Sequence, residues 1–526
     1  MVKMKNSITK TIFVTILLLL WAINLYSFQD VSFVRIRFSD PSDMTILVKM
    51  GTDIARLKTP GVVEAWVTEG EFEKISLKGF DVEYIPDLAK IYADSLEKAT
   101  RGTSNPMDDY HNYDELTTFL NNIVDDHPNI CQLISIGTSV QGRELWFMKI
   151  TDNPTVEESE PEFKYIANMH GNEPVGRELC FYLIDWLTDN YGTNTRATYL
   201  VDNAEIWIMP SMNPDGFELH QRYNVQGVDL NRDFPDRISD PNNTTDGRAP
   251  ETQAVMNWAF QHSHILSANL HTGALVINYP YDSNESGNNV YTACPDDALF
   301  IDISLSYSIH NSPMYNSPYF DQGITNGTDW YVIYGGMQDW NYEWQGDFEV
   351  TIEQSNTFWP PASQLPSYWA DNQESMISYM ESMFRGIKGI VTDASTGLPV
   401  AASIEIVGID HKVYTDPDVG DYYRMVMPGI YDLLVETDGY EPQIIENVIV
   451  NEQEQTIVDI QFGITCTPGD VNNDGEINIA DIVKVVQFIL ILDIPDDYEF
   501  CAADWNFDGV INVQDIVGIV QYILNQ

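Results

Sequence analysis

Near its C-terminal end the chain contains the same twelve-residue pattern twice. The segments "DVNNDGEINIAD", from Asp470, and "DWNFDGVINVQD", from Asp504, each put Asp or Asn at positions 1, 3, 5 and 9, Gly at position 6 and Asp at position 12. Calcium binds about six or more hard oxygen ligands, and Gly at position 6 permits the sharp turn between them. One such loop could equally be a solvated acidic turn, but two loops in register predict a pair of calcium sites.

Each loop runs into an apolar, helix-like segment, "IVKVVQFIL" or "IVGIVQYIL". Paired loops each followed by one helix, without the entering helix of an EF-hand, resemble a type I dockerin module. The resemblance implies a small all-α module over residues 466–526, two structural Ca²⁺ ions and a cohesin-like scaffold protein as partner. The predicted ligands, with Glu476 and Val510 at the backbone-carbonyl position, are Asp470, Asn472, Asp474, Glu476, Asn478, Asp481, Asp504, Asn506, Asp508, Val510, Asn512 and Asp515.

The net charge and the cysteines restrict the partners and the compartment. With 79 acidic against 27 basic residues the net charge is -52, which argues against nucleic acid as a partner, because phosphate contacts need clustered Lys and Arg. Cationic partners and calcium fit this charge, and so does a solvated acidic surface in a salty habitat. Five cysteines cannot all pair within one molecule; Cys466 and Cys501 each precede one loop by a few residues, which favours a local disulfide.

The first 30 residues have the pattern of an export signal. Lys3, Lys5 and Lys10 precede the apolar run "TIFVTILLLLWAINLY", which is short for a membrane span. We expect a signal peptide over residues 1–28, with an uncleaved N-terminal anchor as the alternative, and no membrane span after its removal. The mature protein is therefore expected to be secreted or associated with the cell surface.

Changes of composition divide the rest of the chain into three regions. Residues 29–105 alternate strand-like runs, "VSFVRIRF", "TILVKM", "VEAWV" and "FDVEYI", with a helix, which predicts a small α+β unit without a chemical motif. Its place between the export signal and the largest region alone suggests a propeptide. Residues 108–384 alternate strands such as "FKYIANMH" and "ILSANLH" with helices such as "GRELCFYLIDWLTDNYG", which predicts an α/β fold around a mixed sheet. Residues 385–463 are short Val/Ile-rich strands broken by Gly and Pro, the pattern of a small β-sandwich.

His170 and Glu173, in "MHGNEPVGRE", are either a metal-binding pair or part of an ordinary polar turn. If they bind a catalytic zinc, the site needs a third protein ligand. His271 ends the run "ILSANLH", so it is expected at the C-terminal end of a strand, where α/β sheets hold ligands. A partly buried structural histidine is the alternative for His271. His262 and His264 are rival ligands, but "QHSHIL" lies at the start of the same run.

A zinc hydrolase also needs a carboxylate that takes a proton from the attacking water. Glu353 lies inside the apolar strand "FEVTIEQ", where an unpartnered charge is costly, and Glu349 shares its face and is the rival. Arg222, Asn231 and Arg232, in "RYNVQGVDLNRDFP", are either ordinary surface residues or a fork of donors for a carboxylate.

The motifs together resemble the zinc metallocarboxypeptidases, in particular their N/E (regulatory) subfamily. The segments are "HGNEPVGRE", "PSMNPDGFE", "RYNVQGVDLNRDFP", "PETQAVMNWA", "SANLHTGALVINYPYD" and "GTDWYVIYGGMQDWNYEW...FEVTIE", and the β-sandwich resembles that subfamily's transthyretin-like domain. The resemblance implies a carboxypeptidase-type mixed sheet flanked by helices, one catalytic zinc and the release of single residues from peptide C-termini.

The resemblance assigns roles position by position. Zinc would be bound by His170, Glu173 and His271, with Glu353 as general base and acid. Arg222 would polarise the scissile carbonyl. Asn231 and Arg232 would bind the substrate's terminal carboxylate. The tyrosine that closes over the substrate in this family matches Tyr331 and not Tyr334 or Tyr342.

Specificity depends on two further positions. Asp282 matches the acid with which the subfamily holds a C-terminal Lys or Arg, and Gln338 also fits. The chain departs from the subfamily at Gly346, where those enzymes usually have Gln, so strict basic specificity and a broader choice both stay open. A related zinc amidase acting on cell-wall or acylated peptides, and a non-catalytic peptide-binding module, are the alternatives to a carboxypeptidase that releases Lys or Arg.

Overall fold

A computed structural model describes residues 31–40, 42–59, 61–98, 109–394, 396–452, 454–463 and 466–525 of the chain. The predicted signal peptide, residues 1–28, lies outside the described residues. None of the helices in the described ranges combines the length and hydrophobicity needed to cross a membrane.

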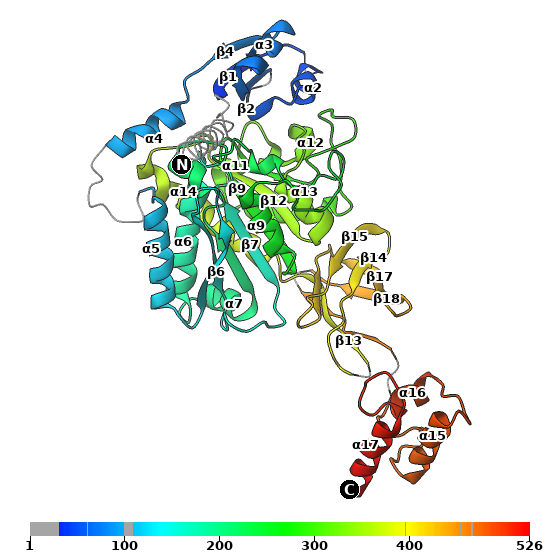
Figure 1. Cartoon of the computed structure of the whole chain (residues 1–526). Coiled ribbons are helices and arrows are strands. Elements are labelled where there is room, and N and C mark those ends of the chain that lie inside the picture. The colour runs from blue at the N-terminus through cyan, green and yellow to red at the C-terminus, as the bar shows by residue number, and fades with distance from the viewer. Residues whose placement is uncertain are drawn as a thin grey trace, which may run out of the picture. The chain divides into compact units, whose positions relative to one another are not determined.

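The N-terminal unit is a four-stranded antiparallel sheet with helices (Figure 1), in the strand order β2-β3-β1-β4. Val34, Ile36 and Leu47 are fully buried in its apolar core. The elements are β1 Val31–Arg37, α2 Ser42–Lys49, β2 Asp53–Thr59, β3 Val62–Thr68, α3 Glu69–Leu77, β4 Asp81–Tyr84 and α4 Leu88–Lys98.

One expected strand of this unit is wrong. The run "TILVKM" belongs to helix α2 and its C-terminal end, while strand β2 was not expected. Met44 and Leu47 are buried three positions apart, the spacing of one helix face, and Asp43 and Lys49 complement the helix dipole at its two ends. A short apolar run cannot be assigned to strand or helix by periodicity alone.

The largest region contains the predicted mixed sheet, with eight strands in the order β11-β10-β12-β9-β7-β8-β6-β5. Its centre, β12-β9-β7-β8, is parallel, whereas β6 and β5 on one side and β10 on the other add antiparallel pairs. The strands are β5 Cys131–Thr138, β6 Glu144–Ile150, β7 Glu162–Ala167, β8 Glu205–Met209, β9 His264–His271, β10 Leu275–Tyr279, β11 Ile324–Asn326 and β12 Phe348–Gln354.

Helices cover both faces of this sheet, so the central strands are buried along their whole length. On one face Ile166 of β7 joins an apolar cluster with Trp258 and Met337, whereas Tyr165 donates a hydrogen bond to the Met376 carbonyl on the other. The helices are α5 Tyr113–Asp126, α6 Val175–Asn190, α7 Thr195–Asn203, α8 Pro214–Glu218, α9 Pro250–Ala259, α10 Asp297–Ser308, α11 Ser312–Tyr315, α12 Gly327–Trp330, α13 Met337–Trp340 and α14 Leu365–Glu381.

Residues 386–462 form two four-stranded sheets, in agreement with the expected β-structure. One sheet has the order β16-β13-β19 with β20 also paired to β13, and the other has the order β15-β14-β17-β18. Ile387, Ile404 and Leu433 are among the buried apolar side chains. The strands are β13 Gly386–Asp393, β14 Ser403–Ile406, β15 Ile409–Tyr414, β16 Asp421–Arg424, β17 Gly429–Glu436, β18 Gln443–Val450, β19 Gln455–Ile457 and β20 Ile460–Phe462.

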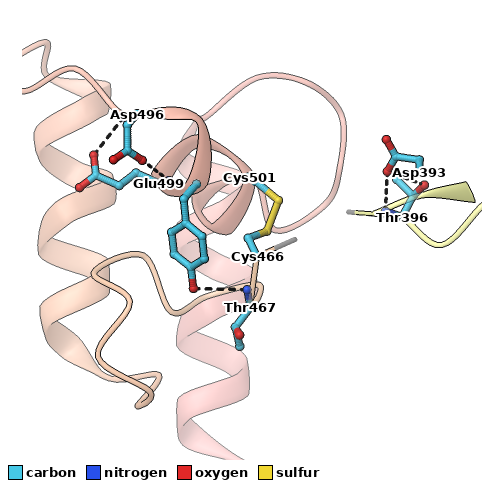
Figure 2. Close-up of a disulfide and its surroundings, with 8 residues drawn as sticks. Asp393, Thr396, Cys466, Thr467, Asp496, Glu499 and Cys501 are labelled. Atoms are coloured by element: carbon cyan, nitrogen blue, oxygen red, sulfur yellow. Dashed lines mark hydrogen bonds between the residues drawn. A yellow bond between two sulfur atoms is a disulfide. The ribbon is translucent and has the colours of Figure 1, made fainter. Parts of the chain in front are cut away.

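The C-terminal module contains helices α15 Ile479–Ile489, α16 Asp497–Ala503 and α17 Val513–Leu524. The first and third follow the two acidic loops as expected, and Asn478 and Asn512 cap them. Helix α16 was not expected; a capping box between Asp496 and Glu499 begins it (Figure 2). Cys466 and Cys501 form the disulfide that their positions favoured, with their Cα atoms 6.0 Å apart.

The two acidic loops fold alike. In the first loop Asp470 accepts hydrogen bonds from the Asp474 and Gly475 amides, and in the second Asp504 accepts the equivalent bonds from the Asp508 and Gly509 amides. Asp481 and Asp515, at position 12, are fully buried and accept two backbone hydrogen bonds each. In both loops the Asp residues at positions 1 and 12 therefore point inward, as oxygen ligands of one cation would.

Candidate active site

Three parallel strands bring the predicted metal ligands and base together. His271 is the last residue of β9, Glu353 lies one residue before the end of β12, and His170 and Glu173 follow the end of β7. The C-terminal ends of parallel strands meet at one edge of the sheet, where α/β folds bind ligands. Gly171 is required in the turn after β7, because a Cβ there would lie 2.1 Å from the Gly216 carbonyl carbon.

His170, Glu173 and His271 form a compact, buried group. His170 Nδ1 lies 3.0 Å from His271 Nδ1 and 3.0 Å from Glu173 Oε1, and His271 Nδ1 lies 3.0 Å from Glu173 Oε2. Two imidazoles and a carboxylate are a ligand set that zinc binds while keeping a position for another ligand. The geometry and the donor types therefore fit one zinc ion.

Asp229, which the sequence reasoning missed, orients two of the candidate residues. Its Oδ1 lies 3.0 Å from His170 Nε2, and its Oδ2 accepts from Arg222 Nε and Nη2 at 3.0 and 2.9 Å. Burial opposes the charge, but Arg222 and His170 hold the pKa of Asp229 well below its usual range. A carboxylate on the second nitrogen fixes the tautomer of a histidine ligand and directs Nδ1 to the metal. The sequence signal for Asp229 was its position two residues before the predicted substrate-binding residue Asn231.

Glu353 lines the same cavity as the three candidate ligands. Burial, and then the nearby charge of Glu173, raise the pKa of Glu353 well above the ordinary value. Its Oε2 has no hydrogen-bond partner among the described residues. The rival Glu349 instead lies in a buried polar network, with Asn269 Nδ2 at 2.7 Å and Lys164 Nζ at 3.7 Å, and does not line the cavity.

Arg222, Asn231, Arg232 and Tyr331 also line this cavity. Arg222 Nη1 lies 3.3 Å from Glu173 Oε1, and Asn231 Oδ1 accepts from the Met337 amide at 3.0 Å, which fixes the Asn231 side chain. The rival tyrosines lie elsewhere, because Tyr334 donates to the Asn284 carbonyl and Tyr342 donates to Asp296. His262 and His264, the rival ligands, lie at the opposite end of the strands.

Asp282 is a buried acid at the wall of the cavity. Burial raises the pKa of Asp282 to about 7, with Asn278 donating to its Oδ1 at 2.8 Å. Behind it Asp339, a residue the sequence reasoning missed, accepts hydrogen bonds from the Asp282 amide. Gly327 must be Gly, since a Cβ there would lie 1.9 Å from Asp282 Oδ1.

Gln338 and Gly346 are not among the residues that line the cavity. Gln338 is buried, and its side-chain amide has no hydrogen-bond partner within the described residues. Gly346 has φ +73° and ends the π-helical turn Asn341–Gln345 before β12, a left-handed conformation that favours Gly. The departure at Gly346 is therefore explained by the backbone.

The N-terminal unit contacts the cavity directly, through residues without any motif. Ala55 of β2 is one of the lining residues, and Asp53 Oδ2 lies 3.3 Å from Arg222 Nε and accepts a hydrogen bond from the Tyr223 hydroxyl. Tyr331 packs against the apolar core of the N-terminal unit. Strand β2 and the turn before it thus lie over the groups that were expected to bind substrate.

Comparisons with known proteins agree with this geometry. A sequence model of the family described as zinc carboxypeptidase matches residues 116–375. The carboxypeptidase N catalytic chain of Homo sapiens is 38% identical over 393 residues, which cover 67% of this chain and 85% of that protein. The chain belongs to the zinc carboxypeptidase family.

Carboxypeptidase D of Mus musculus is 44% identical over 387 residues, which cover 70% of this chain but only 28% of that protein. The chain therefore spans little more than a quarter of this relative's length. The crystal structure of carboxypeptidase A from Helicoverpa armigera matches with a TM-score of 0.54 at 17% identity, covering 68% of this chain and 97% of that one, which supports the zinc carboxypeptidase fold. Residues 468–524 match the model of the dockerin type I domain.

Proposed function

We propose that this protein is an exported zinc metallocarboxypeptidase that releases a single C-terminal residue, Lys or Arg, from peptides. The observation that carries the proposal is one buried cavity. It holds a three-residue zinc ligand set, an acid on the neighbouring strand, and two arginines with an asparagine, and this combination suits the hydrolysis of a bond next to a free carboxylate.

The roles follow from chemistry and position. A zinc ion held by His170, Glu173 and His271 supplies Lewis acidity, which polarises a carbonyl and lowers the pKa of a water. Glu353, whose Oε2 has no hydrogen-bond partner among the described residues, accepts the proton of the attacking water and returns it to the leaving amine. Arg222, held by Asp229, places positive charge where the carbonyl oxygen becomes negative.

Substrate binding uses the other residues of the cavity. The guanidinium of Arg232 and the amide of Asn231 bind the two oxygens of the terminal carboxylate, because a planar fork of donors matches a carboxylate. Tyr331 closes over the terminal residue. Asp282, ionised, receives the cationic end of a Lys or Arg side chain, and the buried site makes this charge recognition selective.

The N-terminal unit acts as a propeptide that covers the cavity. Asp53 forms an ion pair with Arg222, so this catalytic side chain is not available to a substrate. Ala55 lines the cavity and would obstruct substrate entry. The N-terminal signal exports the chain. The C-terminal module binds two calcium ions and attaches the enzyme to a cohesin-like scaffold, which the inward-turned acidic loops and the dockerin match support.

A peptide assay tests the proposed activity. Peptides that differ only in a C-terminal Lys, Arg, Leu or Glu are incubated with the full-length chain and with a form cleaved between residues 98 and 109, with and without a zinc chelator. We expect chelator-sensitive release of Lys and Arg, faster from the cleaved form. No release from any peptide would refute the carboxypeptidase, and faster release of Leu would refute only the basic preference.

A further inference from the structure

A second group of metal-binding side chains lies at the other end of the central strands. Glu162 is the first residue of β7 and pairs in register with His264, the first residue of β9, while His262 lies two residues before that strand. From His264 to His271 there are seven strand steps of about 3.3 Å, so the group is roughly 23 Å from the candidate active site. Nothing in the proposed catalytic function uses these residues.

One carboxylate oxygen is shared by both imidazoles of this group. Glu162 Oε2 lies 2.8 Å from His262 Nδ1 and 3.5 Å from His264 Nε2, and each of the three residues offers one ligand atom within 4.8 Å of the other two. Ligands at about 2.1 Å from a tetrahedral zinc are roughly 3.4 Å apart. The spacing thus matches that of zinc ligands, as it does in the group of His170, Glu173 and His271.

The surroundings hold these side chains in place. The Ser263 amide donates to Glu162 Oε1 at 2.7 Å, which leaves Oε2 for the imidazoles. The His262 ring lies 4.9 Å from the Trp207 ring and 4.7 Å from the Trp258 ring, and the His264 ring lies 4.6 Å from Trp258. Ligands oriented in advance by hydrogen bonds and packing are characteristic of metal sites.

A simple ion pair between His262 and Glu162 accounts for only part of this arrangement. His264 is 96% buried, since its exposed fraction is 4%, and within the described residues its Nε2 has no hydrogen-bond partner although it points at Glu162. A buried, unsatisfied imidazole nitrogen is costly unless something binds it. The neighbouring acid Glu205 is engaged by Lys149 Nζ at 2.5 Å and is not one of the converging groups.

We propose that Glu162, His262 and His264 form a second zinc site, which ties the start of β9 to the start of β7. Two imidazoles favour zinc over calcium or magnesium, which prefer oxygen ligands. The three side chains leave one coordination position for solvent, which can enter past His262, whose side chain is 18% exposed. The site joins two strands and contributes stability, not catalysis.

Metal stoichiometry tests the proposal. The untagged full chain is stripped with a chelator, reloaded with Zn²⁺ under saturating Ca²⁺, desalted and measured by mass spectrometry of metals. We expect two zinc ions in the unmodified chain and one in either His262→Ala or Glu162→Gln. His271→Ala, which removes a ligand at the other site, should also hold one, and His262→Ala/His271→Ala should hold none.

A control variant and a thermal measurement keep the result interpretable. His310→Ala changes an exposed histidine outside both groups and should retain two zinc ions. Zn²⁺ should raise the melting temperature of His271→Ala but not of His262→Ala/His271→Ala. One zinc ion in both the unmodified chain and His262→Ala would overturn the proposal. So would equal Zn²⁺-induced thermal shifts in His271→Ala and His262→Ala/His271→Ala. Either result would leave the carboxypeptidase assignment untouched.

Discussion

Glu353 and His271 are direct neighbours in the parallel pair of strands β12 and β9. Their side chains therefore share one face at the C-terminal end of the sheet, where His170 and Glu173 arrive from the turn after β7. The sheet register thus fixes the position of the proposed base relative to the proposed zinc ligands. This arrangement depends on segments roughly 80 to 180 residues apart in the chain.

The contact between Asp53 and Arg222 predicts autoinhibition. Asp53→Ala removes the ion pair and the hydrogen bond from Tyr223, while every residue proposed for catalysis stays. Loss of one partner of a desolvated charge pair costs roughly 2–5 kcal/mol, so the uncleaved chain should gain about tenfold or more in peptidase activity. The control is Asp81→Ala, an exposed acid of the same unit that pairs with Arg37. If Asp53→Ala, Asp81→Ala and the cleaved enzyme all had equal peptidase activity, the N-terminal unit would not cover the active site.

The raised pKa of Asp282 predicts a pH-dependent preference. Because burial raises this pKa to about 7, the carboxyl group is neutral below that pH and charged above it. We expect kcat/KM for a peptide ending in Lys, relative to one ending in Leu, to rise between about pH 6 and 8. Asp282→Asn should flatten this profile and lower kcat/KM for Lys by roughly 10- to 150-fold, the loss of one charged hydrogen bond. A pH-independent ratio in the unmodified enzyme would argue against Asp282 as the recognition group.

The two acidic loops predict two separable calcium ions. Asp470→Ala removes the residue that closes the first loop, and Asp504→Ala does the same in the second. Calorimetric titration of the full chain with Ca²⁺ should give two sites, one in either variant and none in the double variant. Asp493→Ala, an acid of the same module outside both loops, is the control and should keep both. Two remaining sites in Asp470→Ala would place calcium elsewhere.

Much of the fold was predictable because local sequence patterns determine its strands and turns. The strands around "FKYIANMH" and "ILSANLH" have the continuous apolar character of buried parallel strands, and both acidic loops have their turn chemistry in the sequence. The run "TILVKM" was assigned wrongly because a run so short has no decisive period.

The parts of the site that could not be predicted depend on contacts between distant segments. Asp53 has no motif around it, and only the packing of the N-terminal unit brings it to Arg222. Asp339 accepts hydrogen bonds from the backbone amide of Asp282, a contact that no sequence pattern shows. The reason for Gly at position 346 is its positive φ, which the sequence alone does not reveal.

The most direct test of the central claim measures zinc content and peptide turnover on the same sample of Glu353→Gln, in the form freed of the N-terminal unit. The substitution keeps the side-chain shape and all three proposed ligands but removes the proton acceptor. We predict unchanged zinc content and a loss of kcat of roughly 10²- to 10⁴-fold. Zinc retained together with turnover close to that of the unmodified enzyme would show that Glu353 is not the base and contradict the account.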